Sequence, residues 1–141
     1  MKSLLLTGLA AVAIMGAVYA DQSKTQVVVP VEKTTPVSGK QMYVSYCAPC
    51  HGVDGKGNGP VASAFRQPPT NLTVLSRNNN GKYPADHVIT VLQYGAPIPS
   101  HGTAEMPVWG PIFGSMSHSQ PSERMLRISN LNRYLETIQV K

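Results

Sequence analysis

The sequence predicts a small all-α fold, with three to five short helices joined by long loops. Apolar residues recur at intervals of three and four in three separate segments, which is the pattern of helices packed on a core. Glycine and proline, 12 of each in 141 residues, gather between these segments and favour turns there. Because 6% of the residues are aromatic, a bound cofactor with apolar surface would help to complete so small a core.

The first 20 residues have the pattern of a cleaved export signal. Lys2 supplies the positive start, residues 4–18 form an almost unbroken apolar run, and cleavage is expected after Ala20. The run falls short of the roughly 20 residues that a membrane-spanning helix needs. We therefore expect export to the periplasm or another extracytoplasmic compartment, and an uncleaved membrane anchor is the alternative.

The composition of residues 21–37 predicts a flexible N-terminal arm, either a tether or a strand-like arm, and that of residues 38–141 predicts a single domain. The arm, DQSKTQVVVPVEKTTPV, is polar at both ends and is interrupted by Pro30 and Pro36. The remaining length is that of one ordinary domain.

A first helix is predicted to begin at Ser38. Ser38 and Gln41 have the spacing of a capping box, in which side chains satisfy free backbone N–H groups. The residues that follow and would share one face of this helix are Tyr43, Tyr46, Cys47 and Cys50.

A loop and a second helix are predicted next. Residues 52–70 are rich in glycine and proline and predict a loop, with a brief apolar turn at 61–65. The helix is expected to begin at Pro84, which suits a first helical position, and to end near Gly95. Asp86 would lie in its first turn, where a negative charge is favourable. Its predicted buried stripe is Val88, Val91 and Leu92.

The C-terminal part predicts a long loop and a final helix. The loop runs from residue 96 to about 120, and the helix begins at Pro121 or Ser122. Apolar residues that keep a spacing of three and four along this helix are Ile128, Leu131, Leu135 and Ile138.

The charge pattern does not fit a nucleic-acid-binding protein. The chain carries 12 basic and 7 acidic residues, a formal net charge of +5. The basic residues are scattered apart from Arg124, Arg127 and Arg133, and they lack the density and interleaved aromatics of a nucleic-acid surface. We expect no nucleic-acid partner.

The strongest signal in the sequence is CAPCH, from Cys47 to His51, which is the pattern for covalent attachment of c-type haem. Residues three apart share a helix face, so both thiols can reach the two vinyl groups along one side of the porphyrin. The next residue, His51, can then point its imidazole at the iron. The chain has two cysteines in all, so one haem accounts for both.

Three other interpretations of the cysteine pair are weaker. A structural zinc site needs about four ligands, whereas the other histidines are scattered through the chain. A thioredoxin-like dithiol belongs at the start of a helix after a strand, and a helix is predicted before Cys47. A disulfide across two intervening residues would close too short a loop to add much stability.

Residues 38–139 resemble the class I cytochromes c, a family of small all-helical mono-haem electron carriers and of similar domains fused into respiratory enzymes. Gly39 and Tyr43 match the small and aromatic positions of the family's N-terminal helix. Leu131 and Tyr134 match its C-terminal helix, so the resemblance implies that the two helices cross beside the haem. A glycine at position 39 would also let the two backbones approach closely.

The same resemblance assigns roles around the haem. Gly59-Pro60 resembles the turn whose proline carbonyl accepts the Nδ1 proton of the proximal histidine, which would orient the ring and increase its electron donation. Met106-Pro107 resembles the segment that carries the distal methionine ligand. Trp109 resembles the nearby aromatic residue that contacts a haem propionate. The implied haem-contacting residues are Cys47, Cys50, His51, Pro60 and Trp109, with His51 and Met106 as iron ligands.

The distal ligand has one favoured candidate, Met106, which precedes a proline in a loop that can hold a thioether rigidly. Its main rival is His101. The choice matters because a thioether favours ferrous iron and raises the reduction potential relative to two imidazoles. The remaining candidates, for which core or surface roles are favoured, are Met42, Met116, Met125, His87 and His118.

The expected function is one-electron transfer through Fe(III)/Fe(II) in an extracytoplasmic chain, with redox proteins as partners. No nucleophile and base pair, phosphate-binding glycine loop or paired carboxylates occur at a motif spacing, so no enzyme activity is expected. The first alternative is a haem sensor or peroxidase-like protein with an open or displaceable distal position. The second is a cytochrome subunit of a membrane-associated respiratory complex.

Overall fold

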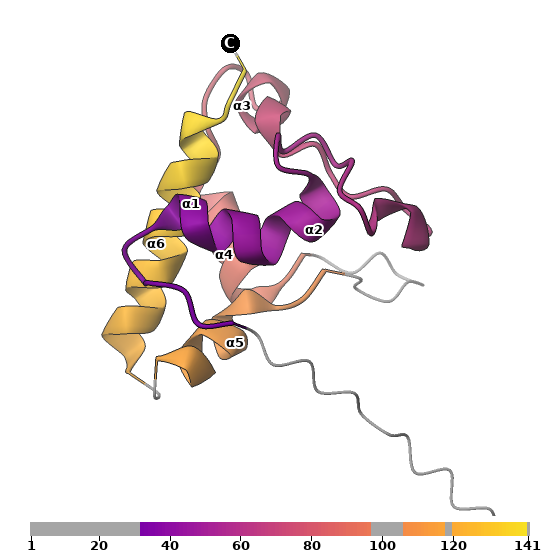
Figure 1. Ribbon diagram of the computed structural model, residues 1–141. Coiled ribbons are helices and arrows are strands. Elements are labelled where there is room, and N and C mark those ends of the chain that lie inside the picture. Colours follow the sequence, from indigo (N-terminus) through magenta and orange to yellow (C-terminus); the bar gives the residue numbers. More distant parts are fainter. Residues whose placement is uncertain (1–31, 97–105, 118–119, 141) are drawn as a thin grey trace, which may run out of the picture. The chain divides into compact units, whose positions relative to one another are not determined.

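The computed structural model describes residues 32–96, 106–117 and 120–140 (Figure 1). Regular structure in these three ranges is entirely helical, which confirms the all-α prediction. No helix within them has the length and apolar character needed to cross a membrane. The predicted signal peptide and residues 21–31 of the predicted arm lie outside the described residues.

The helix predicted at Ser38 is present and has three parts. The Ser38 hydroxyl accepts a hydrogen bond from the Gln41 amide at 3.2 Å, which confirms the predicted cap. Helix α1, Gly39–Met42, passes into a π-helical turn, Tyr43–Cys47, and then into α2, Ala48–His51.

The π-helical turn has a local cause. The amide of Ala48 bonds to the carbonyl of Tyr43, five residues back, in place of the usual four. Pro49 follows; it has no N–H, and in an α-helix its ring would clash with the carbonyl of Ser45. The wider turn relieves that clash, and the helix changes direction before α2 (Figure 1).

Helix α4, Ala85–Tyr94, agrees closely with its prediction. Pro84 caps the helix instead of opening it, and Asp86 lies in the first turn. Gly95 ends the helix with φ +91°, a conformation that favours glycine. Of the predicted stripe, Val88 and Leu92 are buried and Val91 is half-buried.

Helix α6, Pro121–Thr137, begins at the predicted proline. Ile128, Leu131 and Leu135 are buried and Ile138 packs on the edge of the core, as the periodicity predicts. Two polar residues that the pattern did not predict, Arg127 and Asn132, are also buried on this helix.

Helix α1 crosses α6, and the crossing depends on Gly39 (Figure 1). A Cβ atom at this position would overlap the carbonyl of Asn130 and stand 2.8 Å from Cβ of Tyr134. One helical turn later the rings of Tyr43 and Tyr134 meet, with centroids 5.2 Å apart. The predicted close approach of the two backbones is therefore confirmed.

The expectation of a continuous loop from residue 96 to about 120 is wrong. Helix α5, Trp109–Met116, forms within it and packs against α4 and α6. Gly110 lets α5 approach α4, because a Cβ there would overlap the Gln93 carbonyl. The glycine that suggested a loop is thus a packing residue of a helix.

The loop at residues 52–70 is present, and its apolar turn is the 3-10 turn Ala62–Ala64. Two short elements that were not predicted follow, the 3-10 turn Leu72–Val74 and helix α3, Leu75–Asn78. The side chain of Gln139 joins them to the end of α6, because it donates to the Leu72 carbonyl at 2.7 Å.

The prediction of a flexible arm up to residue 37 is wrong for residues 32–37, which we call the strap. Thr34 is buried, and its amide donates to the hydroxyl of Tyr46 at 3.0 Å. The carbonyl of Pro36 accepts from the Asn130 side chain at 3.0 Å. The ordered domain therefore extends at least to Glu32, because partners distant in sequence bind this polar segment.

Candidate haem site

The two thiols lie at the junction of the π-helical turn and α2. Cys47 ends the turn and is 7% exposed, whereas Cys50, in α2, is half-buried. Neither cysteine is in a disulfide. Their separation of three residues puts both on one side of the helix, as two thioether bonds to a single porphyrin edge require.

Burial holds both thiols protonated at neutral pH. It raises the pKa of Cys47 to about 12, with a smaller contribution from the neighbouring Cys50. It also raises the pKa of Cys50, which is less buried. Within the described ranges, no three acidic, histidine or cysteine side chains gather closely enough to hold a metal ion by themselves.

His51 is oriented by a backbone carbonyl. Its Nδ1 lies 2.9 Å from the carbonyl oxygen of Thr70, an acceptor, so Nδ1 carries the proton and Nε2 keeps its lone pair for a metal. Desolvation lowers the pKa of His51, and the bond to Thr70 partly opposes this shift. The imidazole is thus held neutral, the form that binds iron.

The assignment of this carbonyl to Pro60 is corrected by the structure. The acceptor is Thr70, ten residues further along the chain, and Pro60 is exposed. The Gly59-Pro60 turn packs against α2 instead: the amide of Gly59 donates to the Cys50 carbonyl at 3.0 Å. A Cβ at Gly59 would come within 2.6 Å of the Ala48 carbonyl oxygen, which explains the glycine.

Sequence reasoning missed Thr70, and one local signal marks its position. Asn71 follows it and caps the 3-10 turn, since its side chain accepts from the Thr73 amide at 2.9 Å. This cap fixes the chain direction immediately after the carbonyl that meets His51.

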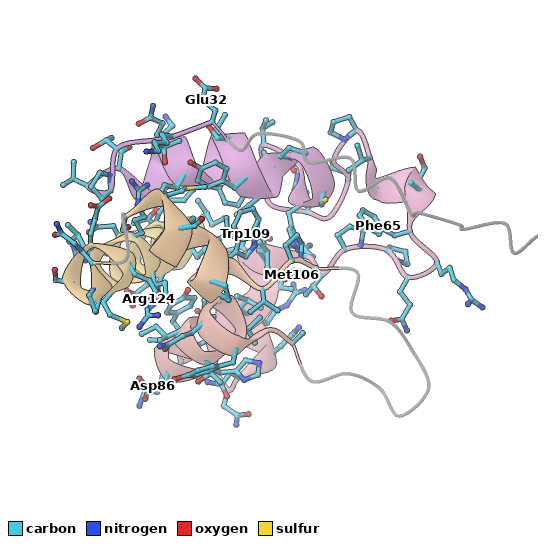
Figure 2. All side chains as sticks on the ribbon, turned by 90° about the horizontal axis from the view of Figure 1, so that it is seen from below. Glu32, Phe65, Asp86, Met106, Trp109 and Arg124 are labelled. Atoms are coloured by element: carbon cyan, nitrogen blue, oxygen red, sulfur yellow. The ribbon has the colours of Figure 1, made fainter. Side chains whose placement is uncertain are left out.

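Met106, the favoured distal ligand, lies in the short segment that leads into α5, half-buried against the core. In Figure 2 it lies beside Trp109, between the cysteine-bearing helix and α4. Met42 and Met116 are buried core residues, and Met125 is exposed on α6. His87 is exposed on α4.

The main rival for the distal position, His101, and the less favoured His118 lie outside the described residues. Among the candidates that the structure describes, Met106 is half-buried at the edge of the core, whereas the others are either buried within it or exposed. Met106 therefore stays the favoured distal ligand.

Trp109 opens α5 and is 7% exposed. Its ring stacks on Tyr46, with centroids 5.4 Å apart and planes inclined at 27°, and it also meets Phe113 at 5.5 Å. Tyr46 is the residue before Cys47. This aromatic cluster thus joins the cysteine-bearing helix to the segment that follows Met106. The contact of Trp109 with a haem propionate stays a prediction.

The residues present fit a covalent haem. Two unpaired thiols stand three residues apart on one helix, and His51 has its Nδ1 occupied and its Nε2 free. Partly buried apolar side chains at the edge of the core include Leu72, Leu75, Ile89, Met106 and Ile112.

The comparison with known families agrees with this site. The family model for cytochrome c matches residues 36–123, which is more than half of the chain and includes the cysteine pair, His51, Met106 and Trp109. No curated protein matches the chain. With its all-helical structure and its Cys-x-x-Cys-His motif, the chain belongs to the cytochrome c family, whose members carry covalent haem c.

Proposed function

We propose that this protein is an exported mono-haem cytochrome that carries single electrons, in which Cys47 and Cys50 would hold the haem through thioether bonds and His51 and Met106 would bind its iron. The observation that carries the proposal is the hydrogen bond between His51 Nδ1 and the Thr70 carbonyl. It presents Nε2 as a ligand in a fixed orientation. Bound haem supplies an iron that accepts and releases one electron.

The protein's part is to hold the redox centre without rearrangement. The Thr70 carbonyl orients the His51 ring, and Cys47 lies within the apolar core. If His51 and Met106 both bind the iron, they would leave no coordination position for a substrate, and this favours electron transfer over bond chemistry. Export rests on the signal pattern of residues 1–20, and the proposed partners are redox proteins, including those of a membrane-associated respiratory complex.

Spectra of the haem-loaded protein test the proposal. A pyridine haemochrome spectrum should show thioether-linked haem, and it should be lost when both Cys47 and Cys50 are replaced by Ser. The oxidised protein should show a sulfur-to-ferric-iron absorption band that Met106→Ala abolishes. Met125→Ala, which removes an exposed methionine on α6, is the matched control and should keep the band.

Carbon monoxide separates the carrier from the sensor or peroxidase-like alternative. A six-coordinate carrier should bind it slowly and weakly at neutral pH in the reduced state. Rapid, tight binding by the wild type would overturn the carrier proposal. A band that survives Met106→Ala would move the distal ligand to another residue.

A further inference from the structure

The hydroxyl of Tyr46 is the point at which the strap, residues 32–37, meets the domain. It donates to the Glu32 carbonyl at 2.5 Å and accepts from the Thr34 amide at 3.0 Å. The Thr34 hydroxyl also lies 3.0 Å away. Because the phenol has one proton, which goes to Glu32, the Thr34 hydroxyl is the donor in the remaining bond.

A buried arginine of α6, Arg127, also binds the strap at Thr34. The guanidinium of Arg127, 3% exposed, donates from Nη1 to the Thr34 carbonyl at 2.9 Å and to the Thr34 hydroxyl at 3.3 Å. Glu123, one turn earlier on α6, pairs with Nη2 at 2.9 Å. Thr34 is thus held between Tyr46 and Arg127, and little freedom is left to either side chain.

The ring of Tyr46 supports α5 on its opposite side. It stacks on Trp109, meets Phe113 at 5.9 Å, and places its hydroxyl 3.6 Å from the sulfur of Met116. These three residues span α5 from its first residue to its last. The Tyr46 side chain therefore contacts three of the four buried residues of α5 while the strap binds its hydroxyl.

We propose that Tyr46 is a positioning residue for the distal side of the haem: the strap holds its ring, the ring holds α5, and α5 holds the Met106 segment. The inference rests on the proposed function, since it assumes that Met106 is the distal ligand. Trp109 stands three residues after Met106, so movement of α5 and departure of the thioether are mechanically linked. Without the strap contacts, an external ligand displaces Met106 more easily.

Displacement of the methionine by imidazole in the oxidised, haem-loaded protein tests this inference. Tyr46→Phe keeps the ring stack and removes the hydroxyl. We expect the apparent Kd for imidazole, followed through loss of the sulfur-to-iron band, to fall about 3- to 10-fold, which corresponds to the net contribution of about one hydrogen bond.

Tyr83→Phe is the matched control. The Tyr83 hydroxyl also joins two parts of the chain, bonding to the carbonyl and the side chain of Asn132 at 3.1 and 2.9 Å, and among the described residues no hydrogen bond joins it to the strap or to α5. Tyr83→Phe should destabilise the protein about as much as Tyr46→Phe does, and it should leave the imidazole affinity close to that of the wild type. Equal affinities in the two variants would overturn the inference.

A second variant, Thr34→Val, removes the strap hydroxyl that bonds to Tyr46 and Arg127. It tests the link between the strap and Met106 even if Tyr46→Phe folds poorly. Alone it should also tighten imidazole binding, and with Tyr46→Phe it should add little, because both changes break one chain of contacts. Full additivity would contradict a linkage through Tyr46. A wild type with no sulfur-to-iron band would overturn the proposed function itself, whereas a normal band with unchanged imidazole binding in the variants would overturn the inference alone.

Discussion

Gly39 of α1 lies so close to Asn130 of α6 that a side-chain carbon at position 39 would overlap the Asn130 carbonyl. Helical hydrogen bonds hold that carbonyl, so the obstacle cannot rotate away. Gly39→Ala should therefore push the two helices apart and lower the free energy of unfolding by about 2–3 kcal/mol. Chemical denaturation of the haem-loaded protein measures the loss.

Gly114→Ala provides the control for this variant. Gly114 lies within the last turn of α5, and its new carbon would stand 3.6 Å from Cδ of Arg124, which is ordinary contact. Removing a helical glycine should leave stability unchanged or raise it by up to about 1 kcal/mol. Equal losses in the two variants would show that the crossing is not specially tight at Gly39.

The bond from His51 to Thr70 should set part of the reduction potential. Gly57 has φ +85°, and a Cβ there would overlap the carbonyl of Pro69, directly before Thr70. Gly57→Ala should displace this segment and weaken the bond. The imidazole would then donate less electron density to ferric iron, and the potential should rise.

Pro60→Ala, which loosens the Gly59-Pro60 turn but keeps its carbonyl, is the control in the same potentiometric titration. Pro60 is exposed and the His51 acceptor is Thr70, so this change should leave the potential near that of the wild type. A rise in Pro60→Ala with none in Gly57→Ala would return the role to Pro60.

The two thiols should differ in reactivity before haem is attached. Cys47 is buried with a pKa raised to about 12, whereas Cys50 is half-buried. Iodoacetamide reacts with the thiolate, so Cys50 should be alkylated first in the haem-free protein. Labelling of Cys47 should keep increasing with pH to about pH 11, because its thiolate fraction grows until the pH approaches the pKa.

Peptide mass spectrometry of a timed alkylation series measures both rates. Equal rates at every pH would mean that the burial of Cys47 is absent before haem attachment. In the haem-loaded protein neither thiol should react, since both sulfurs would be in thioether bonds.

The ion pair of Glu123 with Arg127 should contribute more to the free energy of unfolding than an exposed ion pair does. Glu123→Ala leaves a buried guanidinium without its counter-charge. Since the Glu123 side chain is 30% exposed, we expect a loss of about 1–3 kcal/mol of unfolding free energy, below the value for a fully buried pair. Lys56→Ala, which removes an exposed pair with Asp54, should cost less than about 1 kcal/mol. Thermal unfolding compares the two, and equal shifts would contradict the special role of Arg127.

Much of the fold was predictable because its signals are local. The Ser38 cap, Pro121 at the start of α6 and the three-and-four spacing of Ile128 and Leu131 each depend on a few neighbouring residues. The Cys-x-x-Cys-His motif is equally local, so it identified the cofactor without any knowledge of the fold.

The features that the sequence did not reveal depend on distant partners. Gly110 suggests a loop until the backbone of Gln93 on α4 is known to lie against it. Thr34 belongs to a polar stretch, and its burial requires Arg127, 93 residues away. Thr70 meets His51 through a carbonyl group, which any residue type could supply.

The π-helical turn at Tyr43–Cys47 separates the first helix into two parts, α1 before it and α2 after it, whose side chains face different directions. One extra residue in the turn shifts everything after it by about 100° around the axis relative to a regular α-helix. The length of the turn therefore sets how α2 is rotated relative to α1, the part that packs against α6. A variant lacking one residue of this turn would therefore rotate the segment that carries Cys50 and His51 by about 100° around the helix axis relative to α1.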